Sequence, residues 1–242
     1  MNGVRMNGID AASSGERERY YALQAAVYPK LAVFYDLLVR PFRARRRAVV
    51  RIAGFASGSR IVDVASGTGE EAFAFADAGA IVVGVDMSDA MLRRARAKSA
   101  HRGGGRVTFE RADATRLPYR DADFDGASIS FALHEMPPAV RDDVVREMVR
   151  VTKPGARIVV VDYALPAGPL FGRAVFAFVK LYERDNYVEF IRSDVDALLA
   201  RHGVAVEEHH RLIAGAARVI VGRTAAEPVS EGAGHAPAHS GA

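Results

Sequence analysis

The stretch that decides the fold reads Arg60-Ile61-Val62-Asp63-Val64-Ala65-Ser66-Gly67-Thr68-Gly69-Glu70-Glu71-Ala72. Its opening part is mostly β-branched and apolar, which is typical of a buried strand in a parallel sheet. A turn of small residues follows at once, and the chain then becomes rich in Ala and Phe at helical spacing. A strand, a glycine turn and a helix in this order hold a nucleotide-like ligand at the N-terminus of the helix.

The same alternation continues downstream. Runs rich in Val and Ile predict strands, and amphipathic patterns between them predict helices, one of them with Ser88 as its N-cap. Residues 116–122 form a short, irregular crossover. This order indicates a parallel sheet covered on both faces. The expected strands are Arg60–Val64, Ile81–Val85, Arg106–Arg111, Asp125–Phe131 and Arg157–Tyr163, and the expected helices are Gly69–Ala78, Ser88–Ala100 and Pro138–Val151.

The flanking sequence predicts a single domain with two tails. Residues 1–16 and 224–242 lack periodicity and are expected to be disordered. A helix over 193–202 and two strand-like runs, Val204–Leu212 and Ala216–Gly222, predict a final antiparallel hairpin. The expected domain, 17–223, divides into N-terminal lid helices (17–56), a cofactor-binding core (57–163), a substrate-side insertion (164–192) and the final helix and hairpin (193–223).

Composition excludes several classes of protein. The chain has no cysteine, which removes disulfide frameworks, thiolate zinc sites and cysteine nucleophiles. No stretch reaches the roughly 18 to 20 apolar residues that span a bilayer, and the first residues lack a signal peptide, so we expect a cytoplasmic protein. The formal charge of +4 reflects an excess of arginine. The cluster of Arg40, Arg43, Arg45, Arg46 and Arg47 forms either a solvated helix face or a peripheral contact with an anionic membrane.

The glycine turn fits two kinds of cofactor. Gly67 to Ala72 matches G-x-G-x-x-A, and Asp86 follows about twenty residues later, as a dinucleotide site requires. A dinucleotide would place its anionic pyrophosphate beside Asp63, Glu70 and Glu71, which would repel it. S-adenosylmethionine carries a sulfonium and an ammonium instead, and acidic surroundings suit these cations. The charge pattern therefore favours S-adenosylmethionine.

Three residues at strand ends complete this interpretation. Asp86 is suited to accept hydrogen bonds from ribose hydroxyls. Met87 offers a polarisable apolar surface for adenine, or is simply a core methionine at a helix start. Asp113 follows the third strand and either accepts from the adenine amine or stabilises a turn.

These motifs together resemble the class I S-adenosylmethionine-dependent methyltransferases, in particular the group similar to the ubiquinone/menaquinone C-methyltransferases. The resemblance covers about 35–222. It rests on Ile61-Val62-Asp63-Val64-Ala65-Ser66-Gly67-Thr68-Gly69, Val83-Gly84-Val85-Asp86-Met87-Ser88, Ala112-Asp113-Ala114 with Leu117-Pro118-Tyr119, Phe124-Asp125, and Arg150-Val151-Thr152-Lys153-Pro154-Gly155-Ala156-Arg157.

The resemblance implies an α/β Rossmann-like three-layer sandwich with a seven-stranded, mostly parallel sheet, an antiparallel last strand and helices on both faces. It implies that Tyr35 belongs to a lid and that Asp86 binds ribose. Ala65 stands where the family usually has glycine. The residues implied around the cofactor are Tyr35, Asp63, Ala65, Ser66, Gly67, Gly69, Asp86, Met87, Asp113, Ala114 and Ser130.

Methyl transfer from a sulfonium is an in-line displacement, so the enzyme mainly aligns the acceptor and excludes water. A base is needed only where the acceptor loses a proton. His134 and Glu135, after the fourth strand, and Tyr163, at the end of the fifth beside Asp162, are the candidate catalytic residues. Each is equally compatible with a structural role.

The apolar segment 165–182 predicts either core packing or a groove for a hydrophobic tail. We therefore expect a small, hydrophobic acceptor, such as a quinol or a lipid. Two alternatives stay open: an NAD(P)-dependent oxidoreductase on the same fold, and a non-catalytic cofactor-binding or nucleic-acid-binding module. Nucleic acid is not expected, because the arginine cluster has almost no interleaved aromatic residues. No metal site is predicted.

Overall fold

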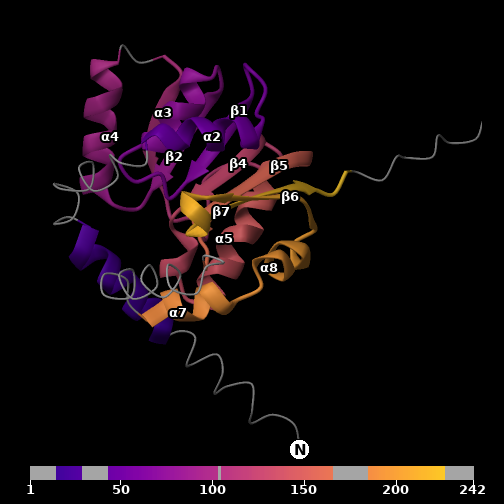
Figure 1. The fold of residues 1–242 in the computed structure, drawn as a ribbon. Coiled ribbons are helices and arrows are strands. Elements are labelled where there is room, and N and C mark those ends of the chain that lie inside the picture. The colour runs from indigo at the N-terminus through magenta and orange to yellow at the C-terminus, as the bar shows by residue number, and fades with distance from the viewer. Residues whose placement is uncertain (1–14, 29–42, 103–104, 166–184, 227–242) are drawn as a thin grey trace, which may run out of the picture.

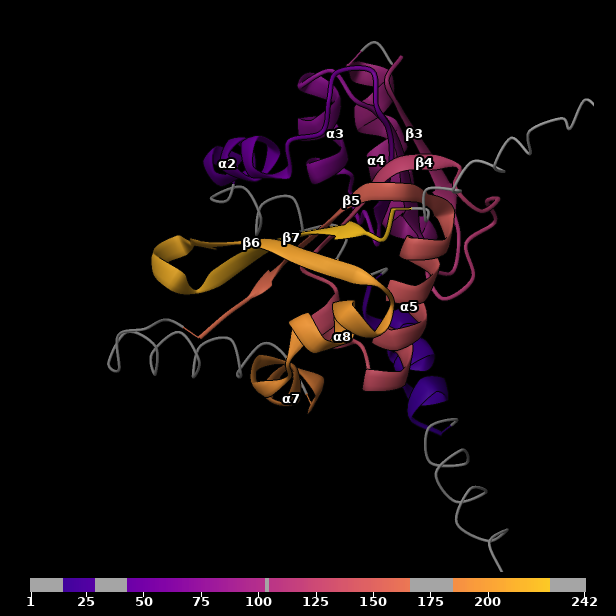
Figure 2. The ribbon, with the colours of Figure 1, turned by 90° about the vertical axis from the view of Figure 1, so that its right-hand side faces the viewer.

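The structure is a computed structural model that describes residues 15–28, 43–102, 105–165 and 185–226. It consists of three layers, with one sheet between two layers of helices (Figures 1 and 2). The predicted fold class is confirmed. Among the described helices, none has the length and apolar character needed to cross a membrane.

The sheet has seven strands in the order β3-β2-β1-β4-β5-β7-β6. β7 pairs antiparallel with both β5 and β6, and the other pairs are parallel. The chain runs outward from β1 to β3 and then returns to β4 on the other side of β1, so the strand order reverses between β1 and β4. Ligands bind at such a reversal. The strands are β1 Arg60–Val64, β2 Ile81–Asp86, β3 Val107–Arg111, β4 Phe124–Ser130, β5 Thr152–Tyr163, β6 Val204–Leu212 and β7 Ala217–Thr224.

The helices bury one apolar stripe each against a face of the sheet. α2 (Arg43–Ala53), α3 (Glu70–Asp77) and α4 (Asp89–His101) cover one face, where Phe75 and Leu92 pack against Ile61. α5 (Pro138–Val151), α7 (Asp185–Arg192) and α8 (Val195–Arg201) cover the other. Figure 2 shows these two sets on opposite sides of the strands. Residues 15–28 form a further helix, and Leu133–Glu135 (η2) and Ile213–Gly215 (η3) are short 3-10 helices.

Most predicted elements lie within a residue or two of the observed ones. Ser88 does cap α4, since its side chain accepts a hydrogen bond from the Met91 backbone N–H. Two boundaries differ. β5 begins at Thr152 rather than Arg157, and β7 continues to Thr224, one residue past the predicted end of the domain. The two extensions stabilise each other, because the Thr224 hydroxyl accepts from the Ala156 N–H and donates to the Lys153 carbonyl.

Candidate functional site

A cavity lies at the carboxyl edge of the sheet, at the reversal between β1 and β4. Ala65 follows β1, Asp86 ends β2, Asp113 follows β3 and Ser130 ends β4, and all four line the cavity. The helix over 15–28 forms its roof through Tyr20, Tyr21, Gln24 and Tyr28. Side chains far apart in the sequence therefore converge where this fold holds its ligands.

The glycine turn gives the cavity its shape. Ala65, Gly67 and Gly69 all have positive φ, at 54°, 54° and 81°. Gly69 has a second reason to be glycine, since a Cβ atom there would lie 2.3 Å from the ring of Phe109. The backbone in this turn is strained at Ala65, which is common at ligand sites. Asp63 of β1 and Ser66, Gly67 and Gly69 of the turn do not line the cavity themselves.

Asp86 fastens the turn to the end of β2. Its two carboxylate oxygens accept hydrogen bonds from the backbone N–H groups of Gly67 and Ser88, both at 2.8 Å. Burial raises the pKa of Asp86. Because each carboxylate oxygen can accept more than one hydrogen bond, Asp86 keeps acceptor capacity toward the cavity that it lines.

Glu70, which was expected to lie beside the ligand, is oriented away from the cavity. It lies in a separate depression and pairs with Arg46 at 3.2 Å and with Lys98 at 2.8 Å. The prediction that Asp63, Glu70 and Glu71 together surround the ligand is therefore wrong for Glu70. Local sequence could not reveal the pairing, since both cations come from other helices.

Asp63, in β1, is instead buried next to the turn, and Glu71 is mostly buried, with its Oε2 3.7 Å from Arg46 Nε. Asp63 is 1% exposed and accepts a hydrogen bond from the Ser128 hydroxyl at 2.5 Å. Burial raises its pKa to about 7. Burial, followed by the neighbouring Asp63, raises the pKa of Glu71 to about 8. Because a nearby positive charge favours the ionised form of a buried carboxyl, a cationic ligand in the cavity would favour ionised Asp63, whereas Glu71 already lies beside Arg46.

The roof helix contacts residues on the opposite wall. The Tyr21 hydroxyl donates to Asp113 at 2.9 Å, and the Gln24 amide donates to Glu135 at 3.1 Å. The Tyr28 hydroxyl also donates to Glu135. These contacts leave a free volume of about 70 Å³, well below the roughly 300 to 1,000 Å³ of typical ligand pockets. The helix thus lies in part of the space that a cofactor-sized ligand needs.

The three candidate catalytic residues lie together. His134 is 1% exposed, and its Nδ1 lies 2.7 Å from Asp162 Oδ1. Its Nε2 lies 3.9 Å from Glu135 Oε1, and its ring centre lies 4.6 Å from that of Tyr163. Glu135 lines the cavity, whereas His134 and Tyr163 lie behind it.

The sequence predicted lid helices over 17–56, but not the residues that form the roof or the pairing of His134 with Asp162. Tyr20, Gln24 and Tyr28 recur every fourth residue and mark one helical face, which was the available signal. The predicted lid residue Tyr35 lies outside the described residues. Of the predicted site residues, those that line the cavity are Ala65, Asp86, Met87, Asp113, Ala114, Ser130 and Glu135.

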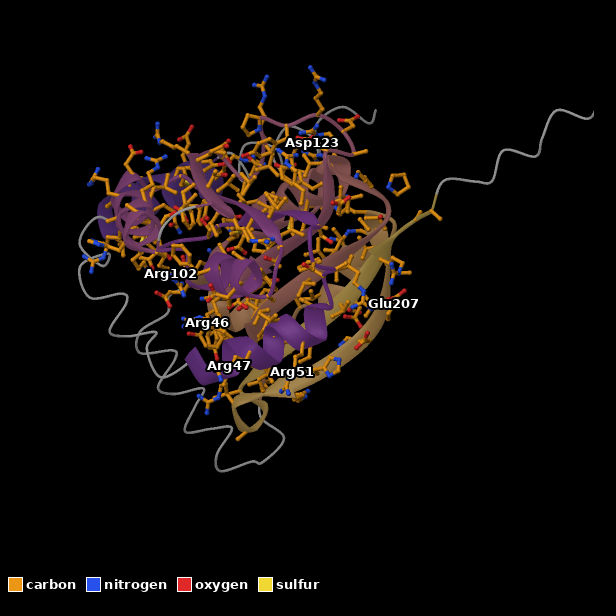
Figure 3. The ribbon with its side chains drawn as sticks, turned by 90° about the horizontal axis from the view of Figure 1, so that it is seen from above. Arg46, Arg47, Arg51, Arg102, Asp123 and Glu207 are labelled. Carbon is orange, nitrogen blue, oxygen red and sulfur yellow. The ribbon has the colours of Figure 1, made fainter. Side chains whose placement is uncertain are left out.

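The predicted arginine cluster falls largely on α2, and Figure 3 shows Arg46, Arg47 and Arg51 along it. Arg45, Arg47 and Arg51 are exposed. Arg40 lies outside the described residues, and Arg43 begins the helix. Arg46, Arg47 and Arg51 border a depression of about 900 Å³ between α2, α3 and α4, which Lys98 and Arg102 also line.

Residues 61–155 match a family described as "Methyltransferase domain". The chain is 35% identical over 178 residues to a demethylmenaquinone methyltransferase of Clavibacter sepedonicus, covering 72% of this chain and 71% of that protein. It is 34% identical over 171 residues to the ubiquinone/menaquinone biosynthesis C-methyltransferase UbiE of Pseudomonas putida strain GB-1, covering 65% of this chain. The match spans 66% of that relative's length, just under two thirds.

Solved structures agree on the fold. A putative methyltransferase of Bacillus halodurans superimposes with a TM-score of 0.61 at 20% identity, and the match covers 75% of this chain and 99% of that one. At this identity the likeness concerns the architecture of the sheet and its helices.

Proposed function

We propose that this chain, which belongs to the class I S-adenosylmethionine-dependent methyltransferases of the ubiquinone/menaquinone C-methyltransferase type, transfers a methyl group to a small hydrophobic acceptor of the quinol class. The observation that carries this proposal is the cavity at the strand reversal, where Asp86, Asp113 and Glu135 converge on one space. The activities for which the relatives are named support a quinol as the acceptor.

The residues of the cavity fit S-adenosylmethionine. The Ser130 hydroxyl is buried and has no hydrogen-bond partner among the described residues, so it is available to a ligand. Asp86 is assigned to the ribose, Asp113 and Ala114 to the adenine edge, and Met87 to the adenine face. Asp63, buried next to the turn, favours a cationic ligand, because a nearby positive charge stabilises its ionised form.

The cofactor supplies an electrophilic methyl group on a sulfonium. The chain's own residues bind it, orient the acceptor and keep water out. Glu135 is assigned to the acceptor side of the cavity, because it lines the cavity near Met136 and Val140. Tyr163 is assigned to the wall behind Glu135, where it packs at 5.5 Å from Tyr187. An apolar wall with a single carboxylate suits a ring with a hydroxyl group.

Calorimetric titration tests the cofactor assignment. We expect S-adenosylmethionine and S-adenosylhomocysteine to bind and NADH not to bind. Replacing Asp86 with Asn should weaken cofactor binding about tenfold or more, because a charge-assisted hydrogen bond contributes roughly 1.5 to 3 kcal/mol. Exposed Asp77→Asn, at the end of α3, is the matched control. Tight binding of NADH without a response to S-adenosylhomocysteine would refute the assignment.

We also propose that the exposed arginines of α2 contact an anionic membrane, which would bring the enzyme to a hydrophobic acceptor. α2 contains no acidic residue, and each basic residue near an anionic surface contributes about 1 kcal/mol. The double substitution R47E/R51E should reduce co-sedimentation with phosphatidylglycerol vesicles. The control is R116E/R120E, which reverses two exposed arginines on the β3–β4 connection. Equal losses in both variants would argue against a specific contact.

A further inference from the structure

We propose that Asp162 is a positioning residue, which holds His134 with its proton on Nδ1 so that Nε2 can take the proton that the methyl acceptor loses through Glu135. This inference rests on the proposed function. It adds a route by which the proton leaves the cavity.

The Asp162 carboxylate makes two backbone hydrogen bonds in addition to its contact with the His134 ring. It is fully buried near the end of β5, and its Oδ1 accepts from the Tyr163 N–H at 2.7 Å as well as lying 2.7 Å from His134 Nδ1. Its Oδ2 accepts from the His134 backbone N–H at 3.3 Å. A carboxylate only accepts hydrogen bonds, so the proton between the two side chains belongs to Nδ1. The imidazole Nε2 is then the basic nitrogen.

The surroundings fix the ring and stabilise the pair. Tyr163 of β5 and Tyr187 and Phe190 of α7 surround the imidazole, with ring centres 4.6 to 6.3 Å away. The charged groups on the neighbouring elements are Glu135 of η2, Arg141 of α5, Glu189 of α7, whose carboxylate lies 2.5 Å from Arg141, and Arg218 of β7. Both arginines interact electrostatically with Asp162. Arg141 also donates to the Leu133 carbonyl, one residue before His134, at 2.9 Å.

Glu135 connects this buried pair to the cavity. Its carboxylate lines the cavity, and Oε1 lies 3.9 Å from His134 Nε2. Its backbone is fixed, since the Asn186 amide donates to the Glu135 carbonyl at 2.7 Å. A carboxylate, an imidazole and a second carboxylate in series form the arrangement that general-base catalysis uses, and the hydrogen bonds of such sites shorten when substrate binds.

In the proposed reaction, proton transfer to Glu135 and His134 accompanies methyl transfer. A quinol hydroxyl gives its proton to Glu135, and the proton passes to His134 Nε2, leaving an imidazolium beside the Asp162 carboxylate. A ring carbon of the deprotonated acceptor forms its bond to the methyl carbon, and the carbon–sulfur bond breaks with its electron pair remaining on sulfur. That ring carbon then loses its hydrogen as a proton while the acceptor oxygen regains one, which restores the aromatic quinol. The sulfonium charge is lost and the imidazolium charge is gained, so total charge is conserved.

Nitrogen NMR of the imidazole tests the positioning role without any acceptor. The full-length protein is labelled at histidine, and the His134 signals are assigned from their loss in His134→Gln. We expect neutral His134 to carry its proton on Nδ1, and Asp162→Asn to reduce that tautomer. A proton on Nε2 in the unaltered protein would overturn the proposal, whatever the acceptor is.

Kinetics with a prenylated 1,4-naphthohydroquinone test the consequence. Asp162→Asn should lower kcat about 100-fold or more, with KM and cofactor affinity changed by no more than about twofold. The acidic limb of its pH–rate profile should move to lower pH, because the carboxylate no longer stabilises the imidazolium. Asp142→Asn is the matched control, since that carboxylate lies 3.2 Å from His202 Nε2, away from the cavity.

The outcomes separate the two proposals. Unchanged kcat in Asp162→Asn would overturn the positioning role while leaving methyl transfer intact. No methylation of the quinol by the unaltered enzyme would refute the proposed acceptor, and the tautomer measurement would then decide the positioning role alone.

Discussion

At the scale of single residues, two separate features require glycine at position 69, and each can be tested by substitution. Gly69 has a positive φ, and it lies against the ring of Phe109. Gly58 has almost the same φ, +84°, but no heavy atom lies within 4 Å of the position that a Cβ atom would take there. Gly58→Ala therefore measures backbone strain alone, and Gly69→Ala measures strain plus a clash.

We expect Gly58→Ala to lower the free energy of unfolding by about 1 kcal/mol and Gly69→Ala to lower it by about 1 to 3 kcal/mol more. Only Gly69→Ala should also weaken cofactor binding. Urea denaturation and calorimetry measure the two effects. Equal costs at both positions would contradict the close packing of the turn against Phe109.

The buried carboxyls predict an unusual dependence of stability on pH. The pKa values of Asp63 and Glu71 are about 7 and about 8 in the folded chain, against ordinary values of 3.8 and 4.5. Between these limits the folded chain binds more protons than the unfolded chain. The contribution of both groups to the free energy of unfolding therefore falls as pH rises from about 4 to about 8.

Asp63→Asn should flatten this dependence and stabilise the chain at pH 8 by at least about 1 kcal/mol. Thermal or urea unfolding across the pH range measures it, with exposed Asp77→Asn as control. S-adenosylmethionine should counter the loss, because its cationic groups favour the ionised carboxylates. A stability that rises steadily with pH in the unaltered protein would contradict the buried pair.

The sequence predicted many of the residues that lie at the site, but it did not predict the direction in which each side chain points. The motif places Asp86 and Asp113 at strand ends, and both line the cavity. It could not show that Glu70 turns away, because the Arg46 and Lys98 side chains that hold it come from separate helices. Asp162 was recognised from the sequence as a neighbour of Tyr163, but its contact with His134 was not predicted, because that contact depends on how η2 packs against β5.

At the scale of elements, we propose that the helix over 15–28, which lies over the cavity, controls access to it. Its tyrosines and Gln24 hydrogen-bond to Asp113 and Glu135 and leave about 70 Å³ of free space. We therefore predict that the helix shifts when a cofactor enters. Removing residues 1–28 should speed the association of S-adenosylhomocysteine about tenfold, because the binding-competent state becomes dominant. Stopped-flow fluorescence measures this rate.

Tyr21→Phe is the finer variant, since it removes one hydrogen bond to Asp113 while keeping the helix. It should speed association by a smaller factor. Unchanged association after truncation would contradict a role for the helix as a lid. The helical pattern of this segment was predictable, because its apolar residues recur at helical spacing. The sequence also predicted lid helices over 17–56, but the contacts of Tyr21 and Gln24 with Asp113 and Glu135 were not predictable, since no local pattern encodes them.

At the scale of the whole molecule, the strand order brings the parts of the site together. The reversal between β1 and β4 opens the cavity, and the antiparallel β7 completes the sheet. Much of this architecture was predictable from sequence because β1, β2, β5 and β7 carry buried Val/Ile runs and the turns after β1 and β2 carry recognisable motifs. Fold alone does not specify chemistry. The proposed activity rests on the residues of the cavity and on relatives that share about a third of their sequence.

The most direct test of the account is transfer of a labelled methyl group. The full-length enzyme is incubated with methyl-labelled S-adenosylmethionine and a reduced prenylated naphthoquinone that lacks the ring methyl group, and the product is identified by mass spectrometry. We predict one labelled methyl group on the quinol, and its loss in Glu135→Gln. Cofactor binding without any label on the quinol would contradict the proposed acceptor, and no binding of the cofactor at all would contradict the account as a whole.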